Sequence, residues 1–185
     1  MSENQNSRPP PRRFLVLGAN GFIGRGVAEV LVRNPASGEV VRHLHRNVGP
    51  GRGEGIRTLD LITASDADLT GLWDEVHPQV VVNCVGATAG DDVTFQELNV
   101  DLVARLVHSL GGREGTRLIQ LGSAAEYGIG EPGRPVVESD RCEPVGAYGR
   151  SKLAATNLVL EAASRGDIDG TVLRVFNPIG PGAPG

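Results

Sequence analysis

The stretch Arg13-Phe-Leu-Val-Leu-Gly18-Ala-Asn-Gly21-Phe-Ile-Gly24 decides the fold of this chain. Its apolar start predicts a short buried strand, and the apolar residues that follow recur at helical spacing as far as residue 33. Between them, the first glycine permits a tight turn, the second lets backbone N–H groups approach a pyrophosphate, and the third lets the helix pack closely on the strand. The helix N-terminus adds free N–H groups and a partial positive charge. This unit predicts a phosphate-binding turn of the dinucleotide-binding kind.

Strands and helices alternate along the rest of the chain. Each connection is long enough for a crossover, and no hairpin turn signal joins consecutive strands. We therefore expect an α/β fold with an open, doubly wound parallel sheet of the Rossmann-like type. Later strands are predicted at 39–45, 56–61, 80–85, 117–121 and 171–176, and helices at 22–33, 66–76, 95–110 and 147–164.

The length of 185 residues favours one domain with a sizeable core. Residues 1–12 are polar and rich in proline, so we expect a disordered tail before a nucleotide-binding domain over 13–185. The Arg12-Arg13 pair precedes an apolar run that is too short for an export signal. We therefore expect a cytoplasmic protein.

Charge and composition argue against several classes of partner and site. A formal net charge of −4 disfavours nucleic-acid binding, and no apolar stretch approaches the length of a membrane span. Cys84 and Cys142 are too few for a disulfide scaffold and lack zinc spacing. His43 and His45 alternate on a predicted strand without a nearby third ligand, so we expect no metal site.

Tyr148 and Lys152 are the candidate catalytic pair. Residues four apart in a helix lie on one face, so the phenol and the ammonium point the same way. A free phenol is a poor base at neutral pH, but a neighbouring ammonium favours the phenolate. Tyr148 could then take a proton from a substrate hydroxyl while hydride leaves for a cofactor, or act in reverse. The only other tyrosine, Tyr127, has Glu131 four residues on and cannot form such a pair.

The glycine spacing G-x-x-G-x-x-G, with Phe22-Ile23 before the last glycine, resembles that of the short-chain dehydrogenase/reductase superfamily. It is especially similar to the extended branch of sugar-nucleotide epimerases and dehydratases. Ser123, in Gln120-Leu-Gly-Ser-Ala-Ala-Glu-Tyr-Gly128, is similar to the serine of that branch and completes a Ser-Tyr-Lys triad. The resemblance implies that Ser123 contacts substrate and hydrogen-bonds the reacting oxygen. A loop serine that satisfies the backbone is the alternative.

The resemblance also implies a set of cofactor-binding positions. Asp60 would lie beside the adenine ring, unless it only caps a turn, and the stretch 83–87 would run along a cofactor ribose. Asn99 would support the active site, unless it is an ordinary polar helix residue. The positions expected to contact the cofactor are Gly18, Asn20, Gly21, Phe22, Ile23, Gly24, Arg46, Asp60, Leu61, Val85, Gly86, Ala87, Asn99, Tyr148 and Lys152.

The choice between NAD and NADP depends on the end of the second predicted strand. NAD binders place an acidic residue about 20 positions beyond the glycine turn, where this chain has Leu44. Arg46 could instead bind the extra phosphate of NADP through charge-assisted hydrogen bonds. A solvated arginine at a strand end is the alternative, but the sequence favours NADP.

The end of the sequence is similar to the segment that leads from the sheet to the substrate pocket in this family. By that match Asn177 faces the substrate and Arg174 anchors the segment. Family members normally continue into a smaller lobe that closes over the sugar nucleotide, so we expect this C-terminal substrate lobe to be missing here.

Two predicted helices, 95–110 and 147–164, match those that the family pairs across a two-fold axis. We therefore expect a homodimer, with Val103, Leu106 and Leu158 exposed on the separate chain and buried in the dimer.

Together these features predict an NAD(P)-dependent epimerase/dehydratase-type oxidoreductase that acts on a nucleotide-sugar. A carbonyl (keto-sugar) reductase is the enzymatic alternative, and Glu126 near Ser123 keeps a dehydratase open. A non-catalytic NAD(P)-binding sensor or scaffold is the alternative outside the enzymes. Such proteins commonly lose the tyrosine or the lysine, and this chain has both.

Overall fold

The computed structural model describes residues 12–34, 38–44 and 55–183, so residues 1–11 of the predicted tail, His45 and Arg46 lie outside the described residues. Six strands form one sheet in the order β3-β2-β1-β4-β5-β6, with every neighbouring pair parallel. The strand order reverses between β1 and β4, which confirms the doubly wound, Rossmann-like sheet. The strands are β1 (Arg13–Leu17), β2 (Glu39–Leu44), β3 (Ile56–Thr58), β4 (Val80–Asn83), β5 (Arg117–Ser123) and β6 (Asp169–Val175).

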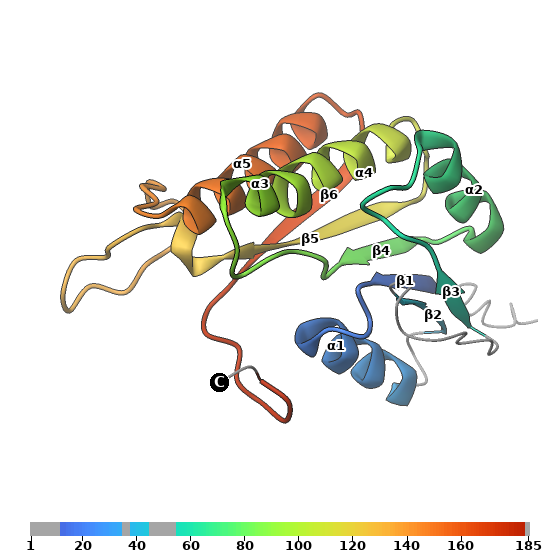
Figure 1. The fold of residues 1–185 in the computed structure, drawn as a ribbon, viewed down its shortest axis with the longest axis horizontal. Helices are drawn as coiled ribbons and strands as arrows, with labels where there is room; N and C mark the ends of the chain where they lie inside the picture. Colours follow the sequence, from blue (N-terminus) through green and yellow to red (C-terminus); the bar gives the residue numbers. More distant parts are fainter. Residues whose placement is uncertain (1–11, 35–37, 45–54, 184–185) are drawn as a thin grey trace, which may run out of the picture.

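Helices lie on both faces of the sheet (Figure 1). Helix α1 lies on one face, and α2, α4 and α5 lie on the other. The helices 22–33, 66–76 and 147–164 have the bounds predicted from the sequence. The helical elements are α1 (Phe22–Arg33), α2 (Asp66–Val76), α3 (Asp92–Phe95), the π-helix η2 (Gln96–Asp101), α4 (Leu102–Leu110), the 3₁₀ turn η3 (Ala124–Glu126) and α5 (Ala147–Ser164).

Several predicted strands and one predicted helix have different bounds in the structure, and the cause is visible for two of these elements. β3 ends at Thr58 rather than at residue 61, because the chain turns at Asp60, whose Oδ1 accepts a hydrogen bond from the Ile62 amide at 3.1 Å. The predicted helix 95–110 begins earlier, because the Asp91 side chain caps it through the amide of Thr94 at 2.9 Å. Its middle is the π-helix η2 rather than regular α-helix.

The main core lies between the sheet and the helices α2, α4 and α5. β4 is buried at every residue, as expected for an apolar parallel strand covered on both faces. Val103 and Leu106 are fully buried within this core, and Leu158 is half-buried. The prediction that Val103 and Leu106 form a dimer core is therefore wrong, because both side chains pack inside their own chain.

Several polar features of the described residues bear on possible sites. His43 is buried, and its ring Nε2 lies 2.9 Å from the carbonyl oxygen of Leu59. Within the described ranges, no group of three or more His, Cys, Asp and Glu could hold a metal ion. No helix in the same part of the chain combines the length and the apolar character that a membrane span requires.

Candidate active site

The glycine turn after β1 needs glycine at two positions. Gly18 has a φ of +73°, a backbone conformation that residues with a side chain rarely adopt. A Cβ on Gly24 would overlap the carbonyl oxygen of Gly18, and it would lie 2.8 Å from that carbonyl carbon and 3.1 Å from the Cα of Ala19. Gly24 is therefore where α1 meets the turn, which is the packing role of the third glycine in a dinucleotide-binding turn.

The N-terminus of α1 presents backbone donors at this turn. Gly21 caps the helix with extended backbone and without a side-chain hydrogen bond, and the first turn contains no acidic residue. Asn20 and Gly21 are both exposed. Because the first N–H groups of a helix have no intrahelical partner, this end of α1 fits a pyrophosphate in both space and charge.

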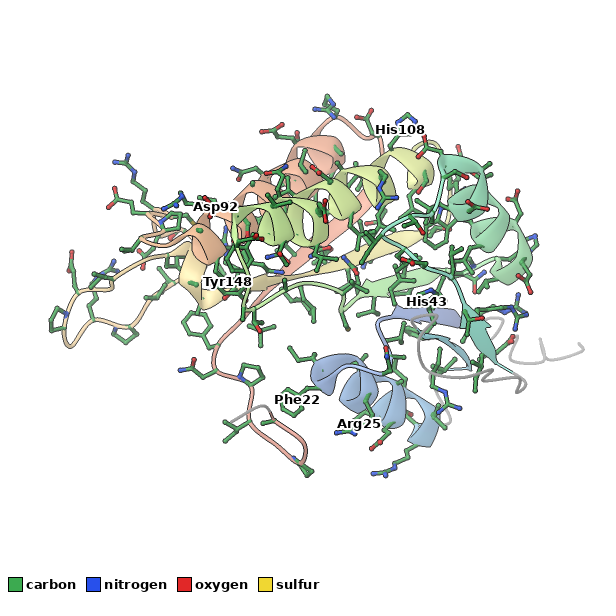
Figure 2. The ribbon with its side chains drawn as sticks, viewed as in Figure 1. Phe22, Arg25, His43, Asp92, His108 and Tyr148 are labelled. Carbon is green, nitrogen blue, oxygen red and sulfur yellow. The ribbon has the colours of Figure 1, made fainter. Side chains whose placement is uncertain are left out.

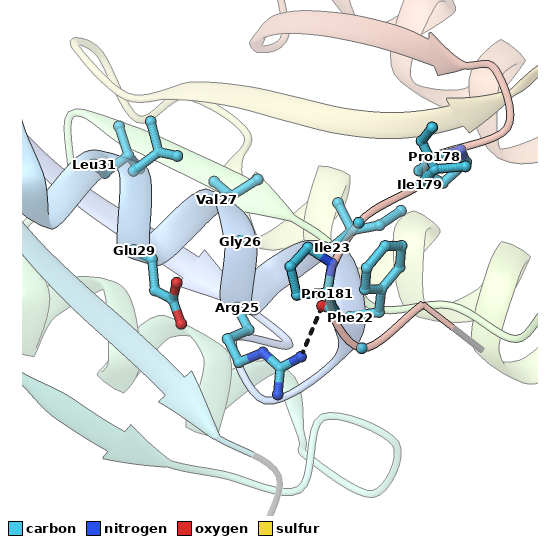
Figure 3. A pocket seen from close by; sticks show the side chains of 13 residues that line it. Phe22, Ile23, Arg25, Gly26, Val27, Glu29, Leu31, Pro178, Ile179 and Pro181 are labelled. Atoms are coloured by element: carbon cyan, nitrogen blue, oxygen red, sulfur yellow. Dashed lines mark hydrogen bonds between the residues drawn. The ribbon is translucent and has the colours of Figure 1, made fainter.

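The side chains of Phe22 and Ile23 line a hollow of about 830 Å³ between α1 and the segment 178–182 (Figure 3). Arg25 lies at the same hollow, where its Nη2 donates a hydrogen bond to the carbonyl oxygen of Pro181 at 3.3 Å. The side chains of Phe22 and Ile23 line this hollow. These two residues would therefore contribute to a phosphate site through their backbone N–H groups.

The end of β4 forms the wall beside the glycine turn. A Cβ on Gly18 would lie 3.0 Å from Cγ2 of Val85, so the turn and the strand end are in direct contact. Asn83 is fully buried, where its Nδ2 donates to Oε1 of Gln120 at 2.8 Å and its Oδ1 accepts from the Val85 amide at 3.1 Å. Gly86 is exposed, which leaves this strand end accessible to a cofactor ribose.

Asn99 clamps the backbone of Ala87. It lies in η2 and is buried; its Oδ1 accepts from the Ala87 amide at 2.8 Å, and its Nδ2 donates to the Ala87 carbonyl at 3.0 Å and to Oγ of Ser151 at 2.9 Å. A Cβ on Gly86 would lie 2.9 Å from Oδ1 of Asn99, so glycine makes room for this amide. The geometry suits a residue that supports the site rather than one that touches substrate.

The turn after β3 holds Asp60 and Leu61. The Asp60 carboxylate caps this turn, which is the structural role that the sequence left open, and its contact with an adenine ring stays a prediction. The Leu61 side chain is buried in the core. Arg105 of α4 was missed by the sequence analysis: it donates to the carbonyl oxygens of Leu61 at 2.7 Å and Ala64 at 2.6 Å, and so fixes the turn.

Tyr148 and Lys152 enter the site from the first turns of α5. Lys152 is only 7% exposed, and its Nζ donates to the carbonyl oxygen of Leu121 in β5 at 2.5 Å. A Cβ on Gly86 would lie 3.9 Å from the same Nζ, so Lys152 reaches the ends of both β4 and β5. Tyr148 is half-buried, projects beside the end of β5 (Figure 2), and has its ring centroid 5.9 Å from that of Phe95.

Lys152 is also the only lysine in the chain, since every other Lys or Arg position is arginine. The sequence alone shows this single lysine, which draws attention to Lys152 independently of any motif. Burial lowers the pKa of Lys152 below its ordinary value, while Glu126 and Cys84 act in the opposite direction. Burial raises the pKa of Cys84 to about 12, so that thiol is neutral at neutral pH. Glu126 therefore supplies the negative charge that favours the ammonium form of Lys152.

Ser123 lies at the junction of β5 and η3. Its Oγ accepts a hydrogen bond from the Ala125 amide at 3.2 Å, which is the backbone-satisfying role that the sequence left as the alternative. Because the oxygen accepts in this bond, the hydroxyl proton remains available to a reacting oxygen. A Cβ on Gly149 would lie 2.6 Å from the Ala125 carbonyl oxygen, so glycine lets the start of α5 pack closely on this turn.

Glu126 is fully buried and forms an ion pair, with its Oε2 2.7 Å from Nε of Arg174. The same oxygen accepts from Oγ1 of Thr156 at 2.9 Å, and Oε1 accepts from the Ser123 amide at 2.8 Å. The suggestion that Glu126 could serve as a dehydratase acid is therefore at odds with the structure, because its oxygens are occupied inside the fold. Sequence reasoning missed the network because Arg174 lies 48 positions away.

Asn177 follows β6 and is exposed, with a φ of +35°. A left-handed backbone is better tolerated by asparagine than by most residues with a side chain. Arg174, in β6, is anchored to Glu126 and donates through Nη1 to the Tyr127 hydroxyl at 2.9 Å. Contact of Asn177 with a substrate stays a prediction.

Among the described residues, the glycine turn, the ends of β4 and β5 and Lys152 thus gather at the carboxyl edge of the sheet. The glycine turn touches the end of β4, and Lys152 joins the end of β4 to the end of β5, where Ser123 lies. In open α/β sheets, ligands bind outside the carboxyl ends of the strands at the point where the strand order reverses. Here that point is the junction of β1 and β4.

A family model described as the NAD dependent epimerase/dehydratase family matches residues 14–185. The dTDP-6-deoxy-L-talose 4-dehydrogenase (NAD(P)(+)) of Kitasatospora kifunensis is 38% identical over 178 residues, which cover 95% of this chain and 55% of that protein. The dTDP-4-dehydrorhamnose reductase of Mycobacterium tuberculosis is 33% identical over 153 residues, which cover 74% of this chain and 47% of that protein. The chain spans about half the length of these curated relatives.

Solved structures with this fold include the UDP-glucuronic acid 4-epimerase from Bacillus cereus in complex with NAD. The TM-score is 0.73 at 20% identity, over 89% of this chain and 56% of that chain. For the UDP-glucose 4-epimerase from Brucella ovis in complex with NAD, the TM-score is 0.74 at 22% identity, over 90% of this chain and 52% of that chain. At these identities the likeness establishes the fold.

Proposed function

The chain belongs to the NAD-dependent epimerase/dehydratase family, and we propose that it carries the cofactor-binding and catalytic residues of an enzyme that transfers hydride at position 4 of a nucleotide-linked sugar. The observation that carries the proposal is the buried Lys152, which lies between the ends of β4 and β5, one helical turn from Tyr148. The names of the similar 4-dehydrogenase, 4-dehydro-sugar reductase and 4-epimerases share the position at which the sugar reacts.

Each site residue has its own role in this reaction. NAD or NADP, when bound at the glycine turn, supplies the hydride donor or acceptor. Tyr148 takes the hydroxyl proton of the sugar as its carbon loses hydride and a carbonyl forms, and it returns the proton in the reverse direction. The Lys152 ammonium places a positive charge one helical turn from the Tyr148 phenol, beside the proposed proton transfer. The Ser123 hydroxyl donates a hydrogen bond to the reacting oxygen and stabilises its developing charge.

Oxidation or reduction of the sugar is favoured over dehydration. Elimination of water needs an acid for the departing hydroxyl and a base for the neighbouring C–H group. The stretch 123–128 holds one carboxylate, Glu126, and that carboxylate is buried in its ion pair with Arg174. A keto-sugar reductase or dehydrogenase therefore fits best, and an epimerase, which uses the same hydride step, is the second candidate because solved neighbours are 4-epimerases.

The test is a titration of the full-length protein with NADPH and NADH, followed by nicotinamide absorbance assays with dTDP- and UDP-linked sugars. We expect Tyr148→Phe to keep the wild-type affinity for cofactor and to slow hydride transfer by about 100- to 10,000-fold, because only the proton-transfer group is lost. A wild-type protein that binds cofactor but reacts with none of the sugars would instead be a sensor or scaffold. Tighter binding of NADPH than of NADH would support the preference for NADP.

A homodimer and a cytoplasmic location complete the proposal. With Val103 and Leu106 inside the core, the better candidate for a dimer contact is the groove between the α3–η2 segment and α5, which Phe95, Val100, Ala147 and Ala154 line. Both cysteines are free thiols, as in proteins of reducing compartments. Light scattering that gives the molar mass of one chain would rule out the dimer.

A further inference from the structure

Burial of the Glu126 carboxylate lowers the stability of the fold unless its charge is compensated, and this carboxylate has no role in the proposed proton transfer. An ionised side chain without solvent costs several kcal/mol unless it is paired and hydrogen-bonded. Glu126 has three partners that donate to it: the Ser123 amide, the Thr156 hydroxyl and the Arg174 guanidinium. One carboxylate therefore joins the end of β5 to α5 and to β6.

The residues around Glu126 leave room for its carboxylate. A Cβ on Gly122 would lie 2.6 Å from Oε1 of Glu126, so glycine is needed just before Ser123. Arg174 also lies over the ring of Tyr127, with its Cζ 4.8 Å from the ring centroid. The guanidinium bonds Oε2 of Glu126, and Oε1 accepts from the Ser123 amide.

The carboxylate is also the ionised group that acts on Lys152. The groups around Lys152 are Cys84 after β4, Glu126 in η3 and Tyr148 on its own helix, with Arg174 paired to Glu126 from β6. Cys84 is protonated at neutral pH. Glu126 therefore offsets the effect of burial, which lowers the pKa of Lys152.

We propose that Glu126, held by Arg174, is a positioning residue of this active site: it fixes the backbone of Ser123, is tied through Thr156 to the helix that carries Lys152, and serves as the counter-charge of that lysine without touching the substrate. The inference rests on the proposed function, because it assigns Ser123 and Lys152 their roles. It adds one requirement: the ion pair between Glu126 of η3 and Arg174 of β6 must be intact for Ser123, Tyr148 and Lys152 to act together.

The test uses the fact that Lys152 is the only lysine. Protein grown with isotope-labelled lysine gives one set of lysine side-chain NMR signals, so the titration of Lys152 can be followed without cofactor or substrate. In Glu126→Gln we expect the titration midpoint of Lys152 to move to lower pH. We also expect hydride transfer to slow by on the order of 100-fold with cofactor affinity unchanged, because a neutral amide has only one accepting oxygen for the three donors and the Ser123 turn shifts.

Two further variants keep the test decisive. Asp169→Asn breaks the Arg117–Asp169 ion pair, which joins the same two strands at their other ends, and it should leave the Lys152 midpoint and the rate at wild-type values. Glu126→Met/Arg174→Met removes both charges of the pair, a change that proteins often tolerate, and it should shift the Lys152 midpoint as Glu126→Gln does.

Unchanged Lys152 midpoints in both Glu126 variants would overturn the proposal, even if stability falls, because Glu126 would then be only structural. A wild-type rate in Glu126→Gln would overturn it as well. Failure of the wild-type protein to react with any nucleotide sugar would count against the proposed function instead, and the Lys152 titration would still decide the charge effect of Glu126.

Discussion

Replacing Gly24 by alanine tests whether space alone dictates the glycine turn. The new Cβ would overlap the Gly18 carbonyl oxygen, and because the overlapping atoms are backbone, no side chain can swing aside. Helix α1 must move by about 1 Å to restore ordinary contact. Overpacking of this kind costs about 1–3 kcal/mol, and a shift of about 1 Å in a positioning element costs on the order of 100-fold in function. We therefore expect a lower free energy of unfolding and NADPH binding weakened by a similar factor.

The matched control is Gly26→Ala, two residues along the same helix. A Cβ on Gly26 would meet no atom within 4 Å, and alanine is favoured over glycine in a helix interior by about 1 kcal/mol. This variant should be more stable than wild type and bind NADPH normally. Urea unfolding and nicotinamide fluorescence measure both quantities. A Gly24→Ala protein with wild-type stability and affinity would refute the argument from space.

Two further predictions concern buried polar groups. Burial raises the pKa of Cys84 to about 12, whereas an unfolded cysteine ionises at about pH 8.5. Between these two pH values the folded state therefore binds more protons than the unfolded state. The free energy of unfolding then falls as the pH rises. Urea unfolding at several pH values should show a less steep loss in Cys84→Ala, by up to about 1.4 kcal/mol per pH unit, and equal slopes would contradict the assignment. Asn99→Ala leaves the Ala87 amide and carbonyl without their side-chain partner, so urea unfolding should show a loss of about 2 kcal/mol or more. The exposed Asn157→Ala should change stability by less than about 0.5 kcal/mol.

The main helices were predictable because each carries its own signals. α1 follows the glycine turn and stops before Pro35, and α2 begins after Ser65, whose side chain forms a capping box with Asp68. The π-helix η2, which holds the contact of Asn99 with Ala87, has no comparable capping residue or sequence signal. Likewise, an apolar stripe on a helix shows that one face is buried but not what covers it. For that reason the sequence placed Val103 in a dimer contact, whereas the structure buries it in the core of its own chain.

The site shows the same division between local and distant information. Gly18, Gly24, Tyr148 and Lys152 were found from spacing within one strand–helix unit or one helix, where the distances are set by local geometry. The pairing of Glu126 with Arg174 depends on the crossover between β5 and β6, which places them side by side. A sequence reading that identified Glu126 by its distance from Ser123 could not tell a buried ion pair from an acid facing the substrate.

The single lysine stands where an ammonium suits the local geometry. Arginine presents several donors in a rigid plane and stays charged, so it suits places with several acceptors. Arg105 bonds the carbonyl oxygens of Leu61 and Ala64 in this way. Lys152 meets one backbone acceptor, Leu121, in a narrow place beside Gly86. An ammonium is a compact charge whose pKa responds to burial, so it fits there and can influence a phenol one turn away. The buried position of Lys152 therefore suits an ammonium beside the proposed proton transfer.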